Sequence, residues 1–152
     1  MHCYREKKHH AASYIPQFIE KARKDNDIVT VYLFGSHARG NNRCTSDIDL
    51  AVLLDQNISP GKYFEKKLHL LAQATETLKT DEVDLVILNE APVSLAYQII
   101  RDGRVLYQKK GAKGQRVAFQ TLTCDRYFDF QPTAKVLYDG LLQRIKGGRF
   151  GG

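Results

Sequence analysis

The feature that most constrains the fold is a pair of apolar runs, residues 28–34 and 50–54. Both consist mainly of large apolar or β-branched side chains, and runs of this length favour buried strands. The first run ends directly in Gly35-Ser36, and ten residues separate this pair from Asp47. The pattern therefore predicts two strands that are joined by a small-residue turn and a polar loop.

Three aspartates lie beside or within the predicted strands. Asp47 and Asp49 precede the second apolar run, and side chains alternate along a strand, so both are expected on one face. Adjacent carboxylates repel each other unless a cation lies between them, and Mg²⁺ prefers a few carboxylates plus substrate phosphates. A third acid, Asp84, lies within the apolar run 83–88, where a buried charge is costly unless it is paired or metal-bound. We therefore expect Asp84 beside the other two at a metal site.

The turn after the first run has the properties of a phosphate site. Gly35 has no Cβ, so a phosphate can approach the backbone there. Ser36 adds a hydroxyl and an amide at an expected helix start, where anions are stabilised. Arg39 either braces the loop through a salt bridge or lies as a cation near a triphosphate. The candidate nucleotide-binding residues are therefore Gly35, Ser36 and Arg39.

With these residues in place, the chain resembles the polymerase-β-like nucleotidyltransferases, whose signature is Gly-Ser, ten residues and then Asp-x-Asp. The turn Gly-Ser-His-Ala-Arg-Gly, the strand Val-Asp-Leu-Val and the short length are similar to the minimal nucleotidyltransferases of that superfamily. These include the MntA-type antitoxins that act with a HEPN-domain toxin. The resemblance covers roughly residues 15–107.

The resemblance also implies a chemistry. ATP is the expected substrate, with two Mg²⁺ ions held by Asp47, Asp49 and Asp84, and the same three carboxylates are the expected catalytic residues. The implied partner is a HEPN ribonuclease toxin, whose tyrosine receives AMP and which is thereby neutralised. Transfer to a small molecule or to RNA, and a catalytically silent module that only binds the toxin, remain alternatives.

The rest of the chain alternates between helix and strand. Helices are expected over residues 12–24, 62–80 and 92–101, and further strands over 83–88 and 104–108. In the second helix, four apolar residues recur on one face: Phe64, Leu68, Leu71 and Leu78. This order predicts an α/β fold with a small mixed sheet flanked by helices, which the resemblance identifies as the polymerase-β-like nucleotidyltransferase fold.

The chain is expected to divide into a nucleotidyltransferase domain, residues 11–108, and a basic, aromatic helical tail with a Gly-rich end, residues 109–152. Two helical segments are expected in the tail, 116–130 and 133–145, separated by Gln131-Pro132. Its aromatic and basic side chains could stack on RNA, dock a protein partner or pack against the domain. We favour packing and partner docking over RNA.

Composition limits the class of protein. A chain of 152 residues that is 43% hydrophobic and 26% charged is typical of one soluble globular domain. No apolar run approaches the about 18 residues of a membrane span, and the N-terminus lacks the apolar core of a signal peptide. Three distant cysteines do not indicate a disulfide framework or a zinc site, so the cytoplasm is the expected location. The net charge of +6 is uneven, since residues 25–107 are acidic and both ends are basic.

Overall fold

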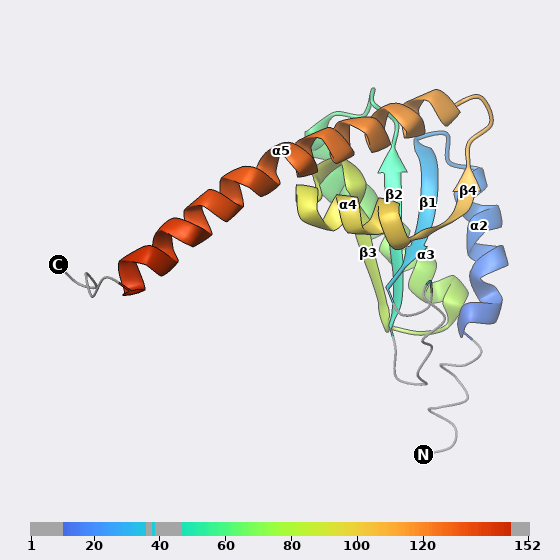
Figure 1. Ribbon diagram of the computed structural model, residues 1–152. Coiled ribbons are helices and arrows are strands. Elements are labelled where there is room, and N and C mark those ends of the chain that lie inside the picture. Colours follow the sequence, from blue (N-terminus) through green and yellow to red (C-terminus); the bar gives the residue numbers. More distant parts are fainter. Residues whose placement is uncertain (1–10, 36–37, 39–46, 147–152) are drawn as a thin grey trace, which may run out of the picture.

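The computed structural model describes residues 11–35, 38 and 47–146. Its centre is a four-stranded sheet in the order β3-β2-β1-β4 (Figure 1). The strands are β1 (Ile28–Phe34), β2 (Ile48–Leu54), β3 (Val83–Ile87) and β4 (Arg104–Gln108). β1 is antiparallel to both β2 and β4, whereas β2 and β3 are parallel. The sheet is therefore mixed, and the predicted α/β fold is confirmed.

Helices cover both faces of this sheet. A short 3₁₀ turn leads into α2 (Ile15–Arg23), and the later helices are α3 (Tyr63–Leu78), α4 (Val93–Asp102) and α5 (Lys113–Lys146). α2 and α3 lie on one face, while α4 and the first part of α5 lie on the other (Figure 1). Of the helices in the described part of the chain, none is both long and apolar enough to cross a membrane.

The core consists of two apolar layers, one on each side of the sheet. β1 and β2 are buried along nearly their whole length because helices cover both of their faces. On one side the sheet packs against Phe18 of α2 and Leu70 of α3, both fully buried. On the other side, Ala96 and Ile99 of α4 pack against a cluster that includes Tyr32 of β1. The two central strands are thus held rigidly from both sides.

The face of α3 that packs on the sheet differs from the one predicted. Its buried residues are Leu70, Ala74, Thr77 and Leu78. Phe64 and Leu68, which were expected to share a face with Leu78, are 68% and 50% exposed. The physical reason is that Leu70, Ala74 and Leu78 pack into the apolar layer that the sheet forms with α2. The ion pair network of Lys66 with Asp25 and Asp27 adds to this packing.

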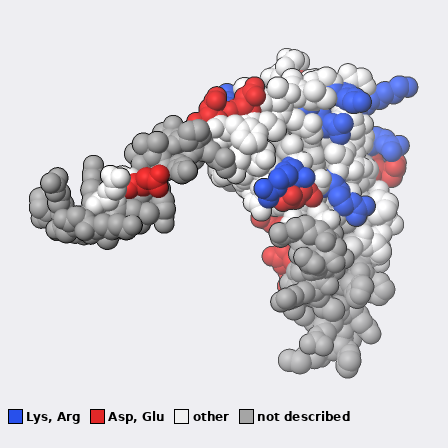
Figure 2. All heavy atoms as spheres, in the orientation of Figure 1, with Lys and Arg blue, Asp and Glu red and all other residues white. Residues whose placement is uncertain are grey.

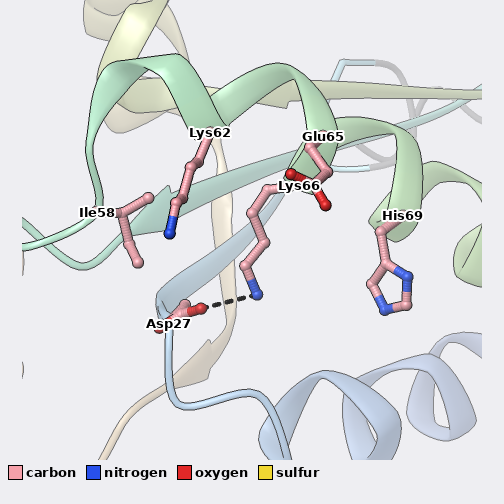
Figure 3. A pocket seen from close by; sticks show the side chains of 6 residues that line it. All are labelled: Asp27, Ile58, Lys62, Glu65, Lys66 and His69. Atoms are coloured by element: carbon pink, nitrogen blue, oxygen red, sulfur yellow. Dashed lines mark ion pairs between the residues drawn. The ribbon is translucent and has the colours of Figure 1, made fainter.

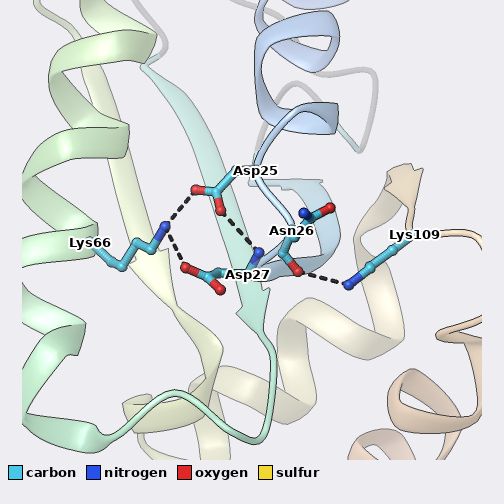
Figure 4. A network of polar contacts seen from close by, with 5 residues as sticks. All are labelled: Asp25, Asn26, Asp27, Lys66 and Lys109. Carbon is cyan, nitrogen blue, oxygen red and sulfur yellow. Dashed lines mark hydrogen bonds and ion pairs between the residues drawn. The ribbon is translucent and has the colours of Figure 1, made fainter.

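This network joins three segments around the turn before β1 (Figure 4). Lys66 Nζ lies 2.6 Å from Asp25 Oδ2 and 2.9 Å from Asp27 Oδ2, and Lys109 Nζ donates to the Asn26 carbonyl at 2.8 Å. Burial lowers the pKa of Lys66, but the hydrogen bonds to the two carboxylates outweigh burial, and its pKa is raised overall. The network therefore holds α3 and the segment after β4 against the start of β1.

Residues 113–146 of the tail form one continuous helix, α5, and the predicted break at Gln131-Pro132 is wrong. Side chains of α5 are described through residue 129 and at 139–141 and 143. Pro132 has no N–H, so the helix continues with one backbone hydrogen bond fewer. The first part of α5 packs against α4, with the rings of Tyr127 and Tyr97 stacked 3.8 Å apart. The second part extends away from the sheet (Figure 1).

Candidate functional site

The turn after β1 closes directly on one of the predicted carboxylates. Gly35 has a φ of +73°, which lies in the left-handed region where a Cβ is disfavoured. An ideal Cβ at this position would lie 3.1 Å from Asp49 Cγ and would overlap Asp49 Oδ2. Glycine is therefore required twice, by the backbone conformation and by the carboxylate beside it. The turn and Asp49 form one compact unit.

Strand register brings a second carboxylate to the same place. Asp49 of β2 pairs with Phe34 of β1 on one side and with Asp84 of β3 on the other. Residues paired in register project from the same face of a sheet, with Cβ atoms about 5 Å apart. Asp49 and Asp84 are consequently neighbours on the face that α4 covers, at the end of the sheet where β1 finishes.

Asp47 lies one residue before β2 and is exposed. The parallel ladder between β2 and β3 begins beside it, where the Ile48 N–H donates to the Glu82 carbonyl at 3.0 Å. Asp47 therefore lies at the same end of the sheet as Asp49. Ser36 and Arg39, the other predicted nucleotide-binding residues, lie outside the described residues.

Asp84 is exposed, so the premise that it occupies a buried strand is wrong. β3 is an edge strand, and only its alternate residues Leu85 and Ile87 are fully buried. An acid on the open side of an edge strand has no large desolvation cost. Its position opposite Asp49 follows from strand register, not from the need to pair a buried charge.

Among the residues described, no group of three or more His, Cys, Asp or Glu side chains lies close enough together to hold a metal ion. Two carboxylates paired in register still fit Mg²⁺, because this ion is usually held by one or two carboxylates together with substrate phosphates. The oxygen donors of Asp49 and Asp84 therefore suit a hard cation that arrives with its nucleotide.

Sequence reasoning missed Phe34 as a neighbour of the site. It is half-buried, pairs with Asp49 across the β1–β2 ladder, and packs against the apolar layer under α4. It gives the carboxylate an apolar neighbour on the face that Asp84 shares. The sequence feature that could have identified Phe34 is its position directly before Gly35, at the end of the predicted strand.

α5 is fixed to the same face of the sheet through a buried phenol. Gln120 of α5 donates from Nε2 to the Tyr32 hydroxyl at 2.9 Å. Burial raises the pKa of Tyr32, while the hydrogen bond from Gln120 and the charge of Arg116 oppose this rise. Tyr32 is therefore a neutral anchor for α5, two residues before Phe34 along β1.

A cavity of about 350 Å³ lies between α3 and the start of β1 and is distinct from this site (Figure 3). Its lining includes Asp27, Lys62, Lys66 and His69. Asp27 precedes β1 and Gly35 follows it, so eight residue steps along the strand separate the two by about 26 Å. The charge of Lys66 is already compensated by carboxylates. This cavity therefore adds nothing to the carboxylate site.

Residues 17–112 match the family described as "Polymerase beta, Nucleotidyltransferase". The match covers more than half of the chain and includes Gly35 and all three aspartates. The chain belongs to this family of nucleotidyltransferases.

Within the family, the chain is similar to curated relatives that are named protein adenylyltransferase MntA. The relative from Shewanella oneidensis is 29% identical over 126 residues, which cover 82% of this chain and 85% of the relative. The relative from Aphanizomenon flos-aquae is 33% identical over 93 residues, which cover 52% of this chain and 56% of the relative.

Solved structures share the fold. A toxin–antitoxin structure with AMP-PNP has a TM-score of 0.66 at 24% identity, covering 86% of this chain and 97% of its own. A structure described as tri-AMPylated Shewanella oneidensis HEPN toxin in complex with MNT antitoxin has a TM-score of 0.61 at 21% identity, covering 89% and 98%. At these identities the likeness shows the common fold.

Proposed function

We propose that this chain is an antitoxin that transfers AMP from ATP to a tyrosine of a cognate HEPN ribonuclease toxin and so neutralises it. The observation that carries the proposal is the Asp49–Asp84 pair next to the Gly35 turn, within a chain of the polymerase-β nucleotidyltransferase family. The similar proteins named protein adenylyltransferase MntA support AMP as the group transferred. The structure of an AMPylated HEPN toxin with its antitoxin supports the toxin as the acceptor.

The proposed roles follow from chemistry and position. Gly35, with Ser36 and Arg39, receives the triphosphate, because a residue without a Cβ leaves room for phosphate beside the Asp49 carboxylate. Asp47, Asp49 and Asp84 hold Mg²⁺, for which we propose two ions. When bound, Mg²⁺ would neutralise phosphate charge and lower the pKa of the incoming hydroxyl.

In the transfer step, the tyrosine oxygen forms a bond to the α-phosphorus of ATP. The bond from that phosphorus to the bridging oxygen of the β-phosphate breaks, and pyrophosphate leaves. Asp84 accepts the phenolic proton, since it is the exposed member of the carboxylate pair and can be reached by an acceptor from solvent. Asp49, beside the Gly35 turn, remains on the nucleotide side.

We assign the transfer reaction to residues 11–108 and a supporting role in toxin docking to the tail, residues 109–152. RNA is not the favoured partner. Among the described residues on the face drawn in Figure 2, Lys and Arg side chains form separate groups, some beside acidic side chains, rather than the continuous stripe expected for a bound backbone. We propose the cytoplasm as the location, which agrees with the odd number of cysteines.

The test uses the ribonuclease activity of the purified cognate toxin, meaning the HEPN protein encoded next to this chain. Preincubation with the chain and MgATP should abolish ribonuclease activity, and inhibition should persist after the chain is removed. The Asp47→Ala, Asp49→Ala double variant should lose this effect, whereas Glu20→Gln, at an exposed acid on α2 outside both the carboxylate site and the tail, should retain it. Inhibition that needs no ATP and is reversed when the chain is removed would instead identify a binding module without catalysis.

A further inference from the structure

We propose that the second part of α5, residues 130–146, is the element on which the acceptor protein docks, and that the acceptor receives it in an apolar groove with an acidic rim. The inference rests on the proposed function, because it states how the acceptor of that reaction is held. The feature that the acceptor recognises is one apolar face of this helix. We call residues 130–146 the arm.

One face of α5 packs on the body of the protein before the arm begins. Phe119 packs against the apolar layer under α4, and Thr123, four residues further on, is 5% exposed. After four more residues, Tyr127 stacks on Tyr97 of α4. Residues three or four positions apart share a face of a helix. The first part of α5 therefore has a continuous contact face toward α4 and the sheet.

The sequence continues the same repeat into the arm. From Tyr127, steps of three or four residues lead to five apolar residues, which we call the arm stripe: Phe130, Ala134, Leu137, Leu141 and Ile145. At 100° per residue, Lys135, Asp139 and Lys146 fall on the opposite side of the helix. A helix with this pattern buries its apolar stripe against another surface.

The arm stripe lies beyond the described body of the protein. After its contacts with α4, α5 extends away from the sheet (Figure 1). Among the stripe positions whose side chains the structure describes, Leu141 is 48% exposed. At a rise of 1.5 Å per residue, the arm is about 25 Å long. Most of the stability of a helix comes from packing of its apolar face, so the arm stripe calls for a partner surface.

The family match places α5 outside the unit that these nucleotidyltransferases share. The match ends at residue 112, and α5 begins at Lys113. The shared unit contains the Gly35 turn and the carboxylates of the proposed reaction, so an element beyond it is suited to selecting the acceptor. The arm also starts beside α4, the helix that covers the face on which Asp49 and Asp84 lie.

A hollow at the root of the arm extends this surface. It has a volume of about 550 Å³ and lies between the start of α4 and α5; its lining is Pro92, Val93, Ser94, Arg126 and Asp129. A side chain of the acceptor can enter the hollow while its groove holds the arm stripe. The acceptor is then fixed by α4 as well as by the arm, on the side of the protein that carries the carboxylates.

Charge and length favour the acceptor over a second copy of this chain. The arm contains three Lys or Arg residues and one Asp, a net charge of +2, so two paired arms would repel each other. A groove with an acidic rim complements the same charge. The arm is also shorter than the three to four heptads that indicate a coiled coil. An amphipathic helix held in a groove needs only a few anchors at this spacing.

The first test uses matched variants on one helix. Leu141 and Leu122 are both 48% exposed on α5, but Leu122 lies in the packed part and outside the contact face. Leu141→Glu should weaken binding of the cognate toxin at least about tenfold, a loss typical of an apolar anchor, in calorimetry on the full chain without ATP. Leu122→Glu should bind the toxin as the wild type does. Equal Kd values for the two variants would overturn the proposal.

Transfer kinetics separate docking from catalysis. In Leu141→Glu, the KM for toxin should rise at least about tenfold, with kcat and binding of MgATP unchanged, because the arm holds only the acceptor. Leu141→Met keeps an apolar side chain of similar size and should retain the wild-type KM. A fall in kcat at unchanged KM, or a loss of binding in Leu141→Met equal to that in Leu141→Glu, would overturn the docking role of the arm stripe.

The second test is amide hydrogen exchange on the full chain. Amides of the arm should exchange more slowly when the cognate toxin is added, while those of α2, on the other face of the sheet, should change little. Protection without toxin that increases with the concentration of the chain would assign the arm stripe to a second copy and overturn the proposal. Protection by an RNA oligonucleotide and not by toxin would overturn it as well.

The two tests distinguish this inference from the proposed function. AMP transfer to toxin that Leu141→Glu leaves unchanged, with no protection of the arm, would overturn docking on the arm and leave the antitoxin activity standing. Toxin binding that depends on Leu141, without transfer by the wild type, would support the arm and reject adenylylation. Absence of both binding and transfer in the wild type would overturn both proposals.

Discussion

Replacing Gly35 with alanine tests whether the turn after β1 and the Asp49 carboxylate act as one site. The chain offers a matched control at Gly111, which has a φ of +81° against +73° at Gly35. The surroundings of the two glycines differ. A Cβ at Gly111 would meet nothing within 4 Å, whereas a Cβ at Gly35 would collide with the carboxylate of Asp49. The pair therefore separates the cost of the backbone conformation from the cost of the collision.

The expected magnitudes follow from these contacts. A left-handed conformation costs a residue with a Cβ about 1–2 kcal/mol, and restriction of the unfolded chain offsets about 0.4–1 kcal/mol, so Gly111→Ala should lose about 1 kcal/mol of stability. Gly35→Ala carries the same term plus overpacking of about 1–3 kcal/mol. Because the collision displaces Asp49, transfer of AMP should also fall about 100-fold, the usual effect of a misplacement near 1 Å.

Urea unfolding of both variants measures stability, and transfer from labelled ATP to the cognate toxin measures activity. Gly35→Ala should be the less stable variant and should lose transfer under conditions where it remains folded, while Gly111→Ala should transfer AMP at the wild-type rate. Equal stability and equal transfer in the two variants would refute the claim that the Gly35 turn and Asp49 form one unit.

Three further predictions concern single side chains. Asp84→Asn should change stability by less than about 0.5 kcal/mol, because Asp84 is exposed, yet reduce transfer at least about 100-fold in the same labelling assay. Asn89→Ala removes both hydrogen bonds that the Asn89 amide makes with the Leu54 backbone, at 2.8 and 3.0 Å, and should cost about 2 kcal/mol in urea unfolding. The hydrogen bond from the Asn57 backbone lowers the pKa of Asp55 below its ordinary 3.8, so Asp55 stabilises the fold above that pH and loses this contribution as the pH falls through its folded pKa. The gap in Tm between wild type and Asp55→Asn should accordingly be present at pH 7 and close as the pH falls below 3.8; a gap that persists in acid would show that it does not come from the ionised carboxylate.

The central strands could be predicted from the sequence because both of their faces are buried. The run 28–34 coincides with β1, since every residue there contacts a layer of side chains. β2 begins at Ile48, so Asp49 lies at the start of this strand, as predicted from its place before the second apolar run, and it pairs with both neighbouring strands. Asp47, which was predicted in the same strand, lies one residue before it.

The edge position of β3 and the rotation of α3 about its axis could not be predicted from local sequence patterns. The exposure of Asp84 depends on the strand order, which places β3 outermost, and no local pattern encodes this order. The rotation of α3 depends on which of its residues meet the apolar layer formed by α2 and the sheet, and these contacts join residues far apart in the sequence. The continuity of α5 through Pro132 reflects the stability of a long helix, which exceeds the loss of one backbone bond.

The account depends most on the claim that the carboxylates beside the Gly35 turn transfer the α-phosphoryl group of ATP as AMP. The direct measurement supplies the chain and its cognate toxin with ATP labelled either at the α-phosphate or at the γ-phosphate. The account predicts toxin labelled only from the α-position, on a tyrosine, and no label when Asp49→Asn replaces the wild type. Label from the γ-position, or transfer that survives Asp49→Asn, would contradict it.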